Sequence, residues 1–325
     1  DANVWKNIGG GDGDVQPWIY QGSVSGYTAG GSIGSGASNN TTRIEKYSLV
    51  SASATGNVAD LTYSKASTIG SCGETHSYWV EPGIASGAPI ERTSYASDTH
   101  DSSLTALVSS GGATIAGGGA AEWSSKDYGY VLGGWRYAPA NSDVNDVEKY
   151  STVNDTNSTA SGDLSETKSD PATSTDGSYG YAAGGKLSPL GASLRIERMS
   201  WATEVNSGSI GSLISGGHCV GGISSLTHGY INSASDISSG VIYTNFQKYA
   251  FASSGITTSS AATLANARGQ NSVASSVTAG FIAKGANSSN SQTNQVKTFL
   301  FASDTTITDV GTLSQNGREA ASSHT

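Results

Sequence analysis

Short apolar runs and glycine pairs recur along this chain at a nearly fixed interval. Each run contains a small residue, an aromatic residue and, in most units, a Gly pair two or three positions further on. The aromatic residues are Tyr27, Tyr78, Tyr130, Tyr181, Tyr230 and Phe281, at intervals of 51, 52, 51, 49 and 51 residues. No stretch shows the sustained 3.6-residue apolar period of an amphipathic helix. A repeat of about 50 residues with strand-like content predicts the blades of a β-propeller.

A second pattern, an apolar residue followed by an acid and a base, occurs in most units and precedes a Leu. The acids and their replacements are Glu45, Glu91, Glu148, Glu197, Gln247 and Lys297. The Leu follows 16 residues later in five units and 17 residues later in the fifth unit. Constant spacing indicates strand pairs joined by tight turns, whereas variable spacing indicates loops.

These landmarks predict four strands in each unit. The second strand runs from the aromatic residue into the Gly pair, the third carries the acid and the base, and the fourth ends near the Leu. The first strand fills the interval before the next aromatic residue, and its expected ranges include 67–71, 113–117, 219–222 and 272–276. These stretches consist mostly of small residues, which fit where strands crowd around a central axis. We therefore expect the first strand to be innermost.

The two ends of the chain supply complementary parts of one unit. The sixth unit holds strands two to four over 280–313, and residues 318–325 read as the start of another first strand. We predict that this C-terminal strand completes the first blade and closes the ring, which removes exposed strand edges. The expected architecture is all-β, a six-bladed propeller of four-stranded blades over 23–325, preceded by a lead segment over 1–22. We expect the lead segment to be a docked segment or an extra strand; the alternative, a seventh blade, is disfavoured because there is no room for its third and fourth strands.

Adjacent residues of a strand point to opposite faces of the sheet, and each face of a blade packs on a neighbouring blade. We therefore predict that some of Glu45, Glu91, Glu148 and Glu197 contact a basic residue of the adjacent blade. The alternative is that these charges lie in solvent on an outer strand.

Composition agrees with many short strands and limits the partners. The chain has 36% hydrophobic residues, 13% charged residues and 43 Gly, which suits neither a helical bundle nor a parallel α/β sheet. No stretch approaches the ~18 apolar residues of a membrane span. A net charge of −9 argues against a nucleic-acid partner, which would need a basic surface. The chain begins at Asp1 and its single methionine is Met199, so we expect a processed chain or a piece of a longer one.

No residue pattern predicts an active site. His76 and His228 occupy the same repeat position, which indicates turn structure rather than a catalytic pair. The remaining histidines have no Cys or His at ligand spacing, and Asp12 with Asp14 lacks the further acids of a calcium loop. We expect no enzyme activity, no catalytic residue, no metal and no cofactor.

The two cysteines, Cys72 and Cys219, fall at non-equivalent positions three units apart. A disulfide requires close approach of the two Cα atoms, so this placement favours two buried free thiols.

Recognition is expected on the loops between second and third strands, because the interval from the aromatic residue to the acid varies most. It is 18, 13, 18, 16, 17 and 16 residues in successive units. Variable loops on a rigid scaffold commonly carry binding sites. The candidate binding residues are Trp79, Trp135, Arg136, Tyr137 and Tyr243. Such side chains stack on sugar rings or anchor a protein partner; alternatively, they cap the hydrophobic layers of the blades.

The motifs Gly-Tyr-x-Ala-Gly-Gly (26–31), Ile-Glu-Lys-Tyr-Ser (44–48) and Ala-Thr-Gly-Asn-Val-Ala-Asp-Leu-Thr (54–62) resemble kelch-like repeats in structural proteins of tailed bacteriophages. The resemblance covers residues 23–325, although a regular Trp before the Leu is missing. It implies a non-enzymatic, extracellular virion protein, such as a tail fibre, another appendage or a host-recognition module. Its partners would be other virion subunits, a host surface glycan or receptor, or further copies of itself. The alternatives are a secreted propeller enzyme acting on glycans and a propeller adaptor for protein–protein interactions.

Overall fold

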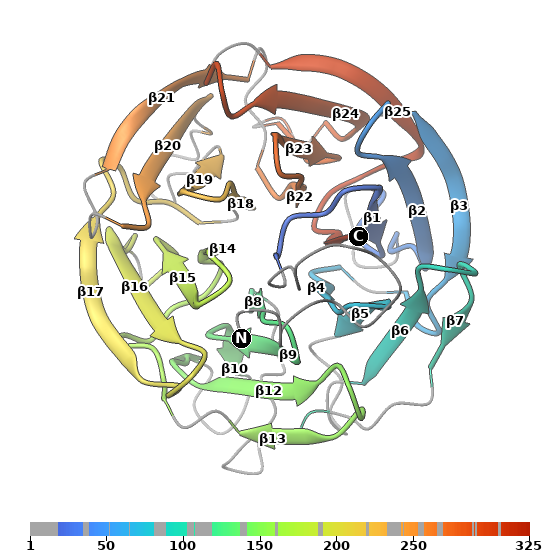
Figure 1. Ribbon diagram of the computed structural model, residues 1–325. Helices are drawn as coiled ribbons and strands as arrows, with labels where there is room; N and C mark the ends of the chain where they lie inside the picture. The colour runs from blue at the N-terminus through green and yellow to red at the C-terminus, as the bar shows by residue number, and fades with distance from the viewer. Residues whose placement is uncertain are drawn as a thin grey trace, which may run out of the picture.

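Six four-stranded antiparallel sheets stand around a common axis and form a closed ring in the computed structural model of the chain (Figure 1). The structure describes residues 19–34, 39–51, 53–64, 66–80, 89–102, 107, 119–136, 142–159, 162–187, 191–218, 221–232, 242, 244–252, 257–264, 269–287, 289, 291–304 and 307–325. The predicted all-β, six-bladed propeller is confirmed.

The first three blades, with strands given from the axis outwards, are as follows. The first blade consists of β26 (Ala321–His324), β1 (Ser25–Ala29), β2 (Arg43–Ser48) and β3 (Ala54–Asp60). The second consists of β4 (Ile69–Cys72), β5 (His76–Val80), β6 (Ile90–Ser94) and β7 (His100–Asp101). The third consists of β8 (Ala121–Ser124), β9 (Tyr128–Leu132), β12 (Val147–Ser151) and β13 (Asn157–Thr159), with an added hairpin of β10 (Trp135–Arg136) and β11 (Ser142–Asp143).

The other three blades follow the same order. The fourth consists of β14 (Ala172–Thr175), β15 (Tyr179–Ala183), β16 (Arg195–Ser200) and β17 (Asn206–Ser212). The fifth consists of β18 (Gly221–Ser224), β19 (His228–Asn232), β20 (Asn245–Ala250) and β21 (Thr257–Thr263). The sixth consists of β22 (Ser272–Ser275), β23 (Ala279–Ala283), β24 (Thr293–Leu300) and β25 (Thr308–Gly317).

The first strand of each unit is innermost, as predicted, but its range in the third blade was wrong. The strand that pairs with β9 is β8 (Ala121–Ser124), whereas the predicted range 113–117 lies outside the described residues. Eight residues separate Leu61 from the start of β4 at Ile69, and 14 separate Leu107 from the start of β8. The third unit therefore carries six additional residues before its inner strand.

The C-terminal strand closes the ring. β26 pairs antiparallel with β1, with Tyr27 opposite Ser323 and Gly26 opposite His324. The Thr325 carbonyl accepts hydrogen bonds from the Ser23 and Val24 amides at 2.8 and 2.7 Å. The predicted pairing of residues 318–325 beside Tyr27 is thus confirmed, and the first blade is built from both ends of the chain.

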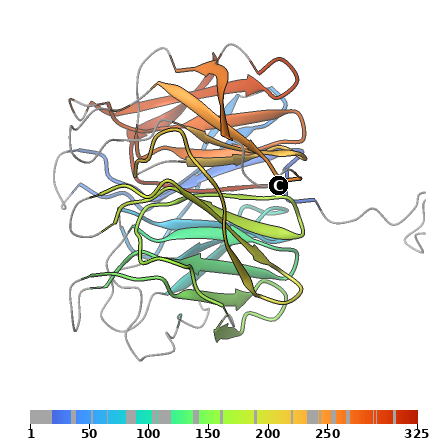
Figure 2. The ribbon, with the colours of Figure 1, turned by 90° about the vertical axis from the view of Figure 1, so that its left-hand side faces the viewer.

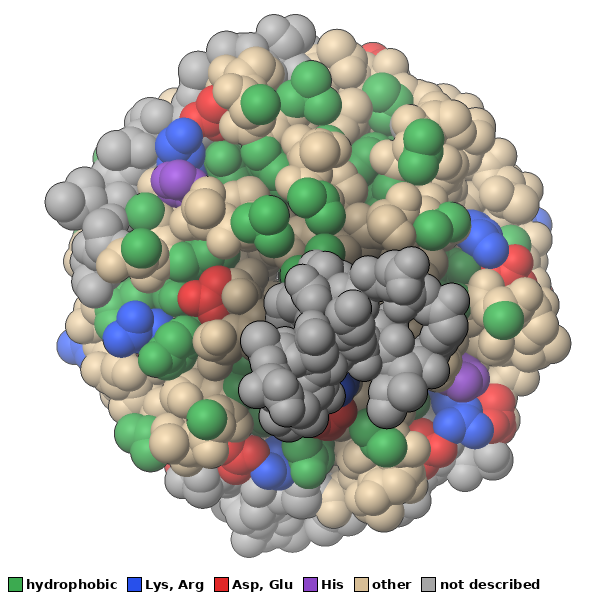
Figure 3. Space-filling view, in the orientation of Figure 1, with side chains coloured by type: hydrophobic (Ala, Val, Ile, Leu, Met, Phe, Trp, Pro, Cys, Tyr) green, Lys and Arg blue, Asp and Glu red, His purple; other side chains and the backbone are tan. Residues whose placement is uncertain are grey.

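The ring has two unlike faces. We call the side where first strands begin and second strands end the loop face, and the opposite side, where Thr325 lies, the turn face (Figure 2). Exposed aliphatic side chains such as Val50, Val153 and Leu226 belong to turns on the turn face. Hydrophobic side chains on this face lie scattered among polar groups (Figure 3). Single apolar side chains on a surface need no special explanation.

Aromatic rings fill the space between successive blades. The aromatic residue of one second strand packs on the third-strand aromatic of the next blade. The ring centroids are 5.7 Å apart for Tyr78 and Tyr150, and 5.4 Å apart for Tyr230 and Phe299. A glycine precedes most of these aromatic residues because a third-strand ring lies over it, and a Cβ at Gly26 would collide with Tyr47 of the same blade. The repeated small-aromatic dipeptide thus follows from packing.

In the first, second and fourth blades the third-strand acid faces the preceding blade and binds the turn after its Leu. The sixth blade has Lys297 in this place, which pairs with Asp309 of its own blade. Glu45 accepts hydrogen bonds from the Ser314 amide at 2.7 Å and from the Gln315 amide at 3.2 Å. Glu91 binds the amide of Thr62 in the same way, at 3.0 Å. In the fifth blade Gln247 replaces the acid and accepts from the Ile214 amide at 2.8 Å. These bonds hold neighbouring blades in register.

Two of these acids also form fully buried ion pairs. Lys284 lies 3.0 Å from Glu45, and Lys168 lies 2.7 Å from Glu197. Lys168 belongs to the third blade, where its amide donates to the Val144 carbonyl. Burial alone would raise the pKa of Glu197, but Lys168 and the bound amides bring it below its ordinary value. The predicted contact with a basic residue of the adjacent blade is confirmed for Glu45 and Glu197.

The base next to the acid faces the following blade. Lys46 lies 2.9 Å from Asp98, and Arg92 lies 2.5 Å from Asp155. Lys149 with Glu204 and Lys248 with Asp304 repeat the arrangement. Each of these acids sits in the turn between third and fourth strands of the next blade, with φ between 51° and 58°. The acid and the base of a third strand therefore link blades in opposite directions around the ring.

We expect Glu45→Ala to lower the free energy of unfolding by about 3–5 kcal/mol, because it leaves Lys284 buried without its counter-charge. Lys284 stands at φ 59°, where Gly30 and Gly184 stand in other blades. The double variant E45A/K284G removes the stranded charge and should unfold at higher urea concentration than E45A. Additive losses in urea titrations with a constant m-value would contradict this interpretation.

His324 gives ring closure a predictable acid sensitivity. Its Nε2–H donates to the Tyr20 carbonyl at 2.7 Å, and burial lowers its pKa from 6.5 to about 4. A depressed pKa stabilises the fold above pH 6.5, and this contribution is lost as pH falls to about 4, by about 3 kcal/mol. We expect His324→Gln to remove this part of the pH dependence, as measured by urea unfolding at pH 7 and pH 4. Parallel pH profiles for the two proteins would contradict it.

Candidate functional site

Trp79 is buried and cannot contact a ligand, so its assignment to a binding surface was wrong. Its side chain is 0% exposed, and its Nε1–H donates to Thr93 Oγ1 at 2.9 Å. It packs with Tyr27, Leu61 and other residues between the first and second blades. Trp79 follows Tyr78 directly in β5, so the two rings point to opposite faces of the sheet and both enter the packing between blades.

Trp135 does lie at the loop face, on the hairpin added to the third blade. Trp135 stands opposite Asp143, and Arg136 opposite Ser142. The indole is half-buried, and Lys186 of the fourth blade lies over it with Nζ 5.2 Å from the ring centroid. Such a contact contributes about 0.5–1 kcal/mol at an exposed site. Tyr137 and Tyr243, the remaining predicted binding residues, lie outside the described residues.

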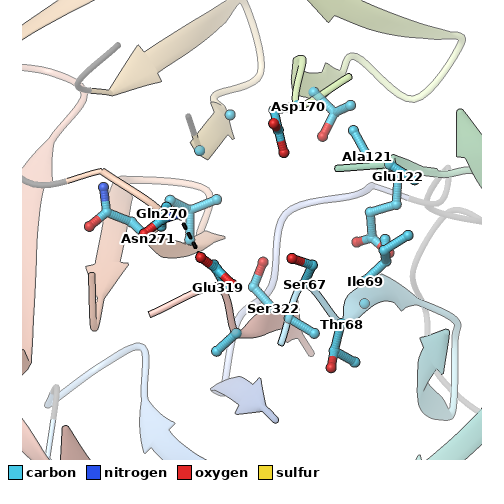
Figure 4. A pocket seen from close by; sticks show the side chains of 18 of the residues that line it. Ser67, Thr68, Ile69, Ala121, Glu122, Asp170, Gln270, Asn271, Glu319 and Ser322 are labelled. Carbon is cyan, nitrogen blue, oxygen red and sulfur yellow. Dashed lines mark hydrogen bonds between the residues drawn. The ribbon is translucent and has the colours of Figure 1, made fainter. Parts of the chain in front are cut away.

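A pocket of about 330 Å³ occupies the loop-face half of the central channel (Figure 4). We call it the channel pocket. All six blades line it, through the starts of their innermost strands. The lining residues include Ser67, Thr68, Glu122, Asp170, Thr173, Gln270, Asn271, Glu319 and Ser322. This volume is at the lower end of the roughly 300–1,000 Å³ range of small-molecule pockets.

Equivalent residues two positions before the inner strands form the mouth of the channel pocket. Ser67, Gly119, Asp170, Gln270 and Glu319 all have positive φ, between 52° and 66°. Their backbones are joined around the axis: the Ser67 amide donates to the Glu319 carbonyl at 3.0 Å, and the Glu319 amide to the Gln270 carbonyl at 2.9 Å. This left-handed conformation aims polar side chains at the mouth, where Figure 4 shows Asp170, Gln270 and Glu319.

The mouth is acidic and partly neutralised by neighbouring groups. Gln270 Nε2 donates to Glu319 Oε1 at 2.6 Å, while Arg318 Nη1 donates to Gln270 Oε1 at 3.1 Å. Burial raises the pKa of Glu319; Arg318 opposes this shift, and Asp170 adds to it. His218 Nδ1 lies 3.8 Å from Asp170.

Glu122 lies deeper in the channel pocket than the mouth residues. It is the second residue of β8, and the equivalent residues of the other inner strands are Gly70, Thr173, Gly222, Val273 and Ser322. Its Oε2 is buried and has no hydrogen-bond partner among the described residues. Burial raises the pKa of this carboxyl well above its ordinary value, and the nearby Cys72 adds to the effect. Glu122 is therefore the one ionisable residue at this level of the inner strands.

Residues 20–22 cross the turn-face end of the channel. Gln21 Nε2 donates to the Ser225 carbonyl of the fifth blade at 3.0 Å, and the Gly22 amide to the Ser275 carbonyl of the sixth at 2.8 Å. The His324 ring meets Tyr20 edge-on, with centroids 4.6 Å apart. These contacts tie the described part of the lead segment to the axis, on the side away from the channel pocket.

His76, His100 and His228 make separate contacts within their own blades. Thr75 Oγ1 lies 2.7 Å from His76 Nδ1, and the same contact is 2.8 Å for Thr227 and His228, as expected for a repeated turn. His100 Nε2 lies 2.8 Å from Glu91 of the same blade. Across the described ranges, no group of three or more His, Cys, Asp or Glu residues is placed to hold a metal ion.

Cys72 is a buried free thiol, as predicted, whose pKa burial raises to about 11. Cys219, the other cysteine, lies outside the described residues.

Sequence reasoning did not identify the channel pocket, although a signal for its mouth exists. Six residues separate Leu61 from Ser67, Leu164 from Asp170, Leu264 from Gln270 and Leu313 from Glu319. Polar residues at this constant offset, just ahead of a strand of small residues, mark positions around the axis. Glu122 was missed because the inner strand of the third blade was placed eight residues too early.

Comparison with known proteins gives the fold alone. No known family profile matches the chain, and no curated protein matches it. Among solved structures, that of YjhT is similar with a TM-score of 0.65 and 14% sequence identity, over 79% of this chain and 87% of YjhT. Within the residues described, no helix has the length and hydropathy to cross a membrane. At this level of identity, the similarity to YjhT supports the β-propeller architecture and says nothing of activity.

Proposed function

We propose that this chain is a non-enzymatic recognition propeller in a virion, carried on a tail fibre or another surface appendage. The kelch-like repeat pattern supports the virion setting, because it resembles that of structural proteins of tailed bacteriophages. The rigid ring supports a role in presenting a surface. Its blades are joined by buried ion pairs such as that of Lys284 with Glu45, which fix the blades and their loops relative to one another.

The observation that carries the proposal is the partly exposed Trp135 on the hairpin of β10 and β11. The hairpin belongs to the third blade, and the first, fourth and sixth blades have a single bridge at the same position, such as that between Lys186 and Ala192. An indole held by Lys186 from the next blade offers a flat apolar surface with polar groups beside it. Aromatic side chains in this setting bind sugar rings or anchor a protein subunit. We take a host surface glycan as the first ligand to test, and another virion subunit as the second.

Trp135→Ala should weaken glycan binding by about 10- to 30-fold, as expected for loss of a central aromatic contact. The measurement is titration of the purified protein against the best ligand found on an array of bacterial surface polysaccharides. Val153→Ser on the turn face, at a residue 72% exposed, is the matched control and should bind normally. His76→Ala should also bind normally. Equal affinity of W135A and the unaltered protein for the glycan would contradict the proposal.

One observation favours a second function, that of a secreted enzyme acting on glycans. A carboxyl group whose pKa is raised by burial, such as Glu122, has the property required of a general acid. This function requires turnover of a glycan that Glu122→Gln abolishes. Release of reducing sugar from the array ligands, followed over hours with both proteins, separates the two functions.

A further inference from the structure

The channel pocket combines negative charge with uncharged hydrogen-bonding groups. Glu122, Asp170 and Glu319 reach it from three different blades (Figure 4). The hydroxyl groups of Thr173 and Ser322 and the amide of Gln270 also belong to residues that line it. None of the described lining residues is Lys, Arg or His. A ligand in this space meets carboxylates on several sides and hydroxyls in between.

Glu122 is the strongest sign that the channel pocket receives a ligand. The other inner strands place Gly, Ser, Thr or Val at its level, so the packing of the propeller does not require a long acidic side chain there. Its Oε2 is shielded from solvent and makes no hydrogen bond with any described residue. A buried carboxylate without a partner costs free energy, which a donor or a positive charge in the pocket would recover.

We propose that the channel pocket binds a small primary ammonium compound bearing hydroxyl groups, of the size and chemistry of an amino sugar. The ammonium group would lie against Glu122, where its three N–H donors can satisfy the unpartnered oxygen. The hydroxyl groups would be held by Thr173 and Ser322, which stand at the same level of the inner strands as Glu122, and by the amide of Gln270 at the mouth. The proposal concerns a site that Trp135 does not line, so it does not depend on recognition by the hairpin.

The same residues disfavour the other classes of ligand. An anion would meet three acidic side chains without a basic partner in the described lining, at a high desolvation cost. A metal ion would need ligands gathered within bonding distance, and no such group of three is found among the described residues. An apolar ligand would leave the buried oxygen of Glu122 unsatisfied.

Binding of an ammonium group should release protons. Burial raises the pKa of Glu122 and Glu319, so both hold protons more strongly in the empty pocket than they would in water. A positive charge beside them favours the ionised carboxylates and lowers both pKa values. The protein should therefore lose protons to the buffer as a cationic ligand enters, and a neutral ligand of the same shape should release far fewer.

Isothermal titration calorimetry at pH 6.5 with glucosamine and glucose tests the proposal, because the two sugars differ in charge at one position. We expect saturable binding of glucosamine and at least tenfold weaker binding of glucose. Titrations in phosphate and in ACES, which both buffer at this pH, differ in ionisation enthalpy and carry no hydroxylated primary amine, should report proton release for glucosamine. Equal affinity for the two sugars, or no saturable binding of glucosamine at millimolar concentration, would overturn the proposal.

Glu122→Gln tests whether the Glu122 carboxyl group binds the ligand. It keeps the shape of the side chain and should weaken glucosamine binding about tenfold or more while reducing proton release. Glu74→Gln removes the same charge from an exposed turn on the other face and is the matched control, with binding unchanged. Thermal unfolding of E122Q, expected at or above the temperature of the unaltered protein, confirms that the fold is intact. Full affinity in E122Q would show that Glu122 does not hold the ligand.

Trp135→Ala should bind glucosamine with unchanged affinity, because Trp135 does not line the channel pocket. This result separates the channel pocket from the hairpin.

Discussion

The structure depends on one buried interaction repeated between blades: a third-strand acid or amide that binds the backbone after the Leu of the preceding blade. Glu45 and Glu91 make this contact through a carboxylate, and Gln247 makes it through its amide oxygen. The bond cannot form within one blade, so these sheets need a neighbour to satisfy their buried polar groups. Ion pairs such as Lys46 with Asp98 act in the opposite direction around the ring. A closed ring is the arrangement in which every blade has both neighbours.

Much of the fold could be predicted because packing imposes residues at a fixed period. An aromatic residue after Gly26 and an acid at Glu45 recur where the same contact recurs, so the blade number and the C-terminal closure follow from spacing alone. The error in the third blade has a physical origin. Six additional residues after Leu107 leave the Gly- and Ala-rich range 113–117 as small in side chain as a true inner strand. Composition could not distinguish it from β8.

The binding residues were harder to predict than the fold. Trp79 and Trp135 are equally aromatic, but Trp79 lies within a second strand and faces a neighbouring blade, whereas Trp135 lies in β10, beyond the end of the second strand, at the loop face. The channel pocket was missed for a different reason. Asp170, Glu319 and Glu122 are far apart in sequence and come together only because three blades share one axis. The pocket that they line therefore depends on the closed ring and cannot be recognised within a single repeat.

Closure of the first blade by β26 also determines the order of events during synthesis. Ala29 and Ala321 pair directly although 292 residues separate them in the chain. At roughly 5–20 residues per second, β1 waits on the order of 15–60 s on the ribosome before its inner partner has been made. Throughout that time its backbone donors and acceptors form an open edge, to which other nascent chains can pair. The first blade to be translated is therefore the one most exposed to misassembly, and slowing translation should lower the yield of native protein.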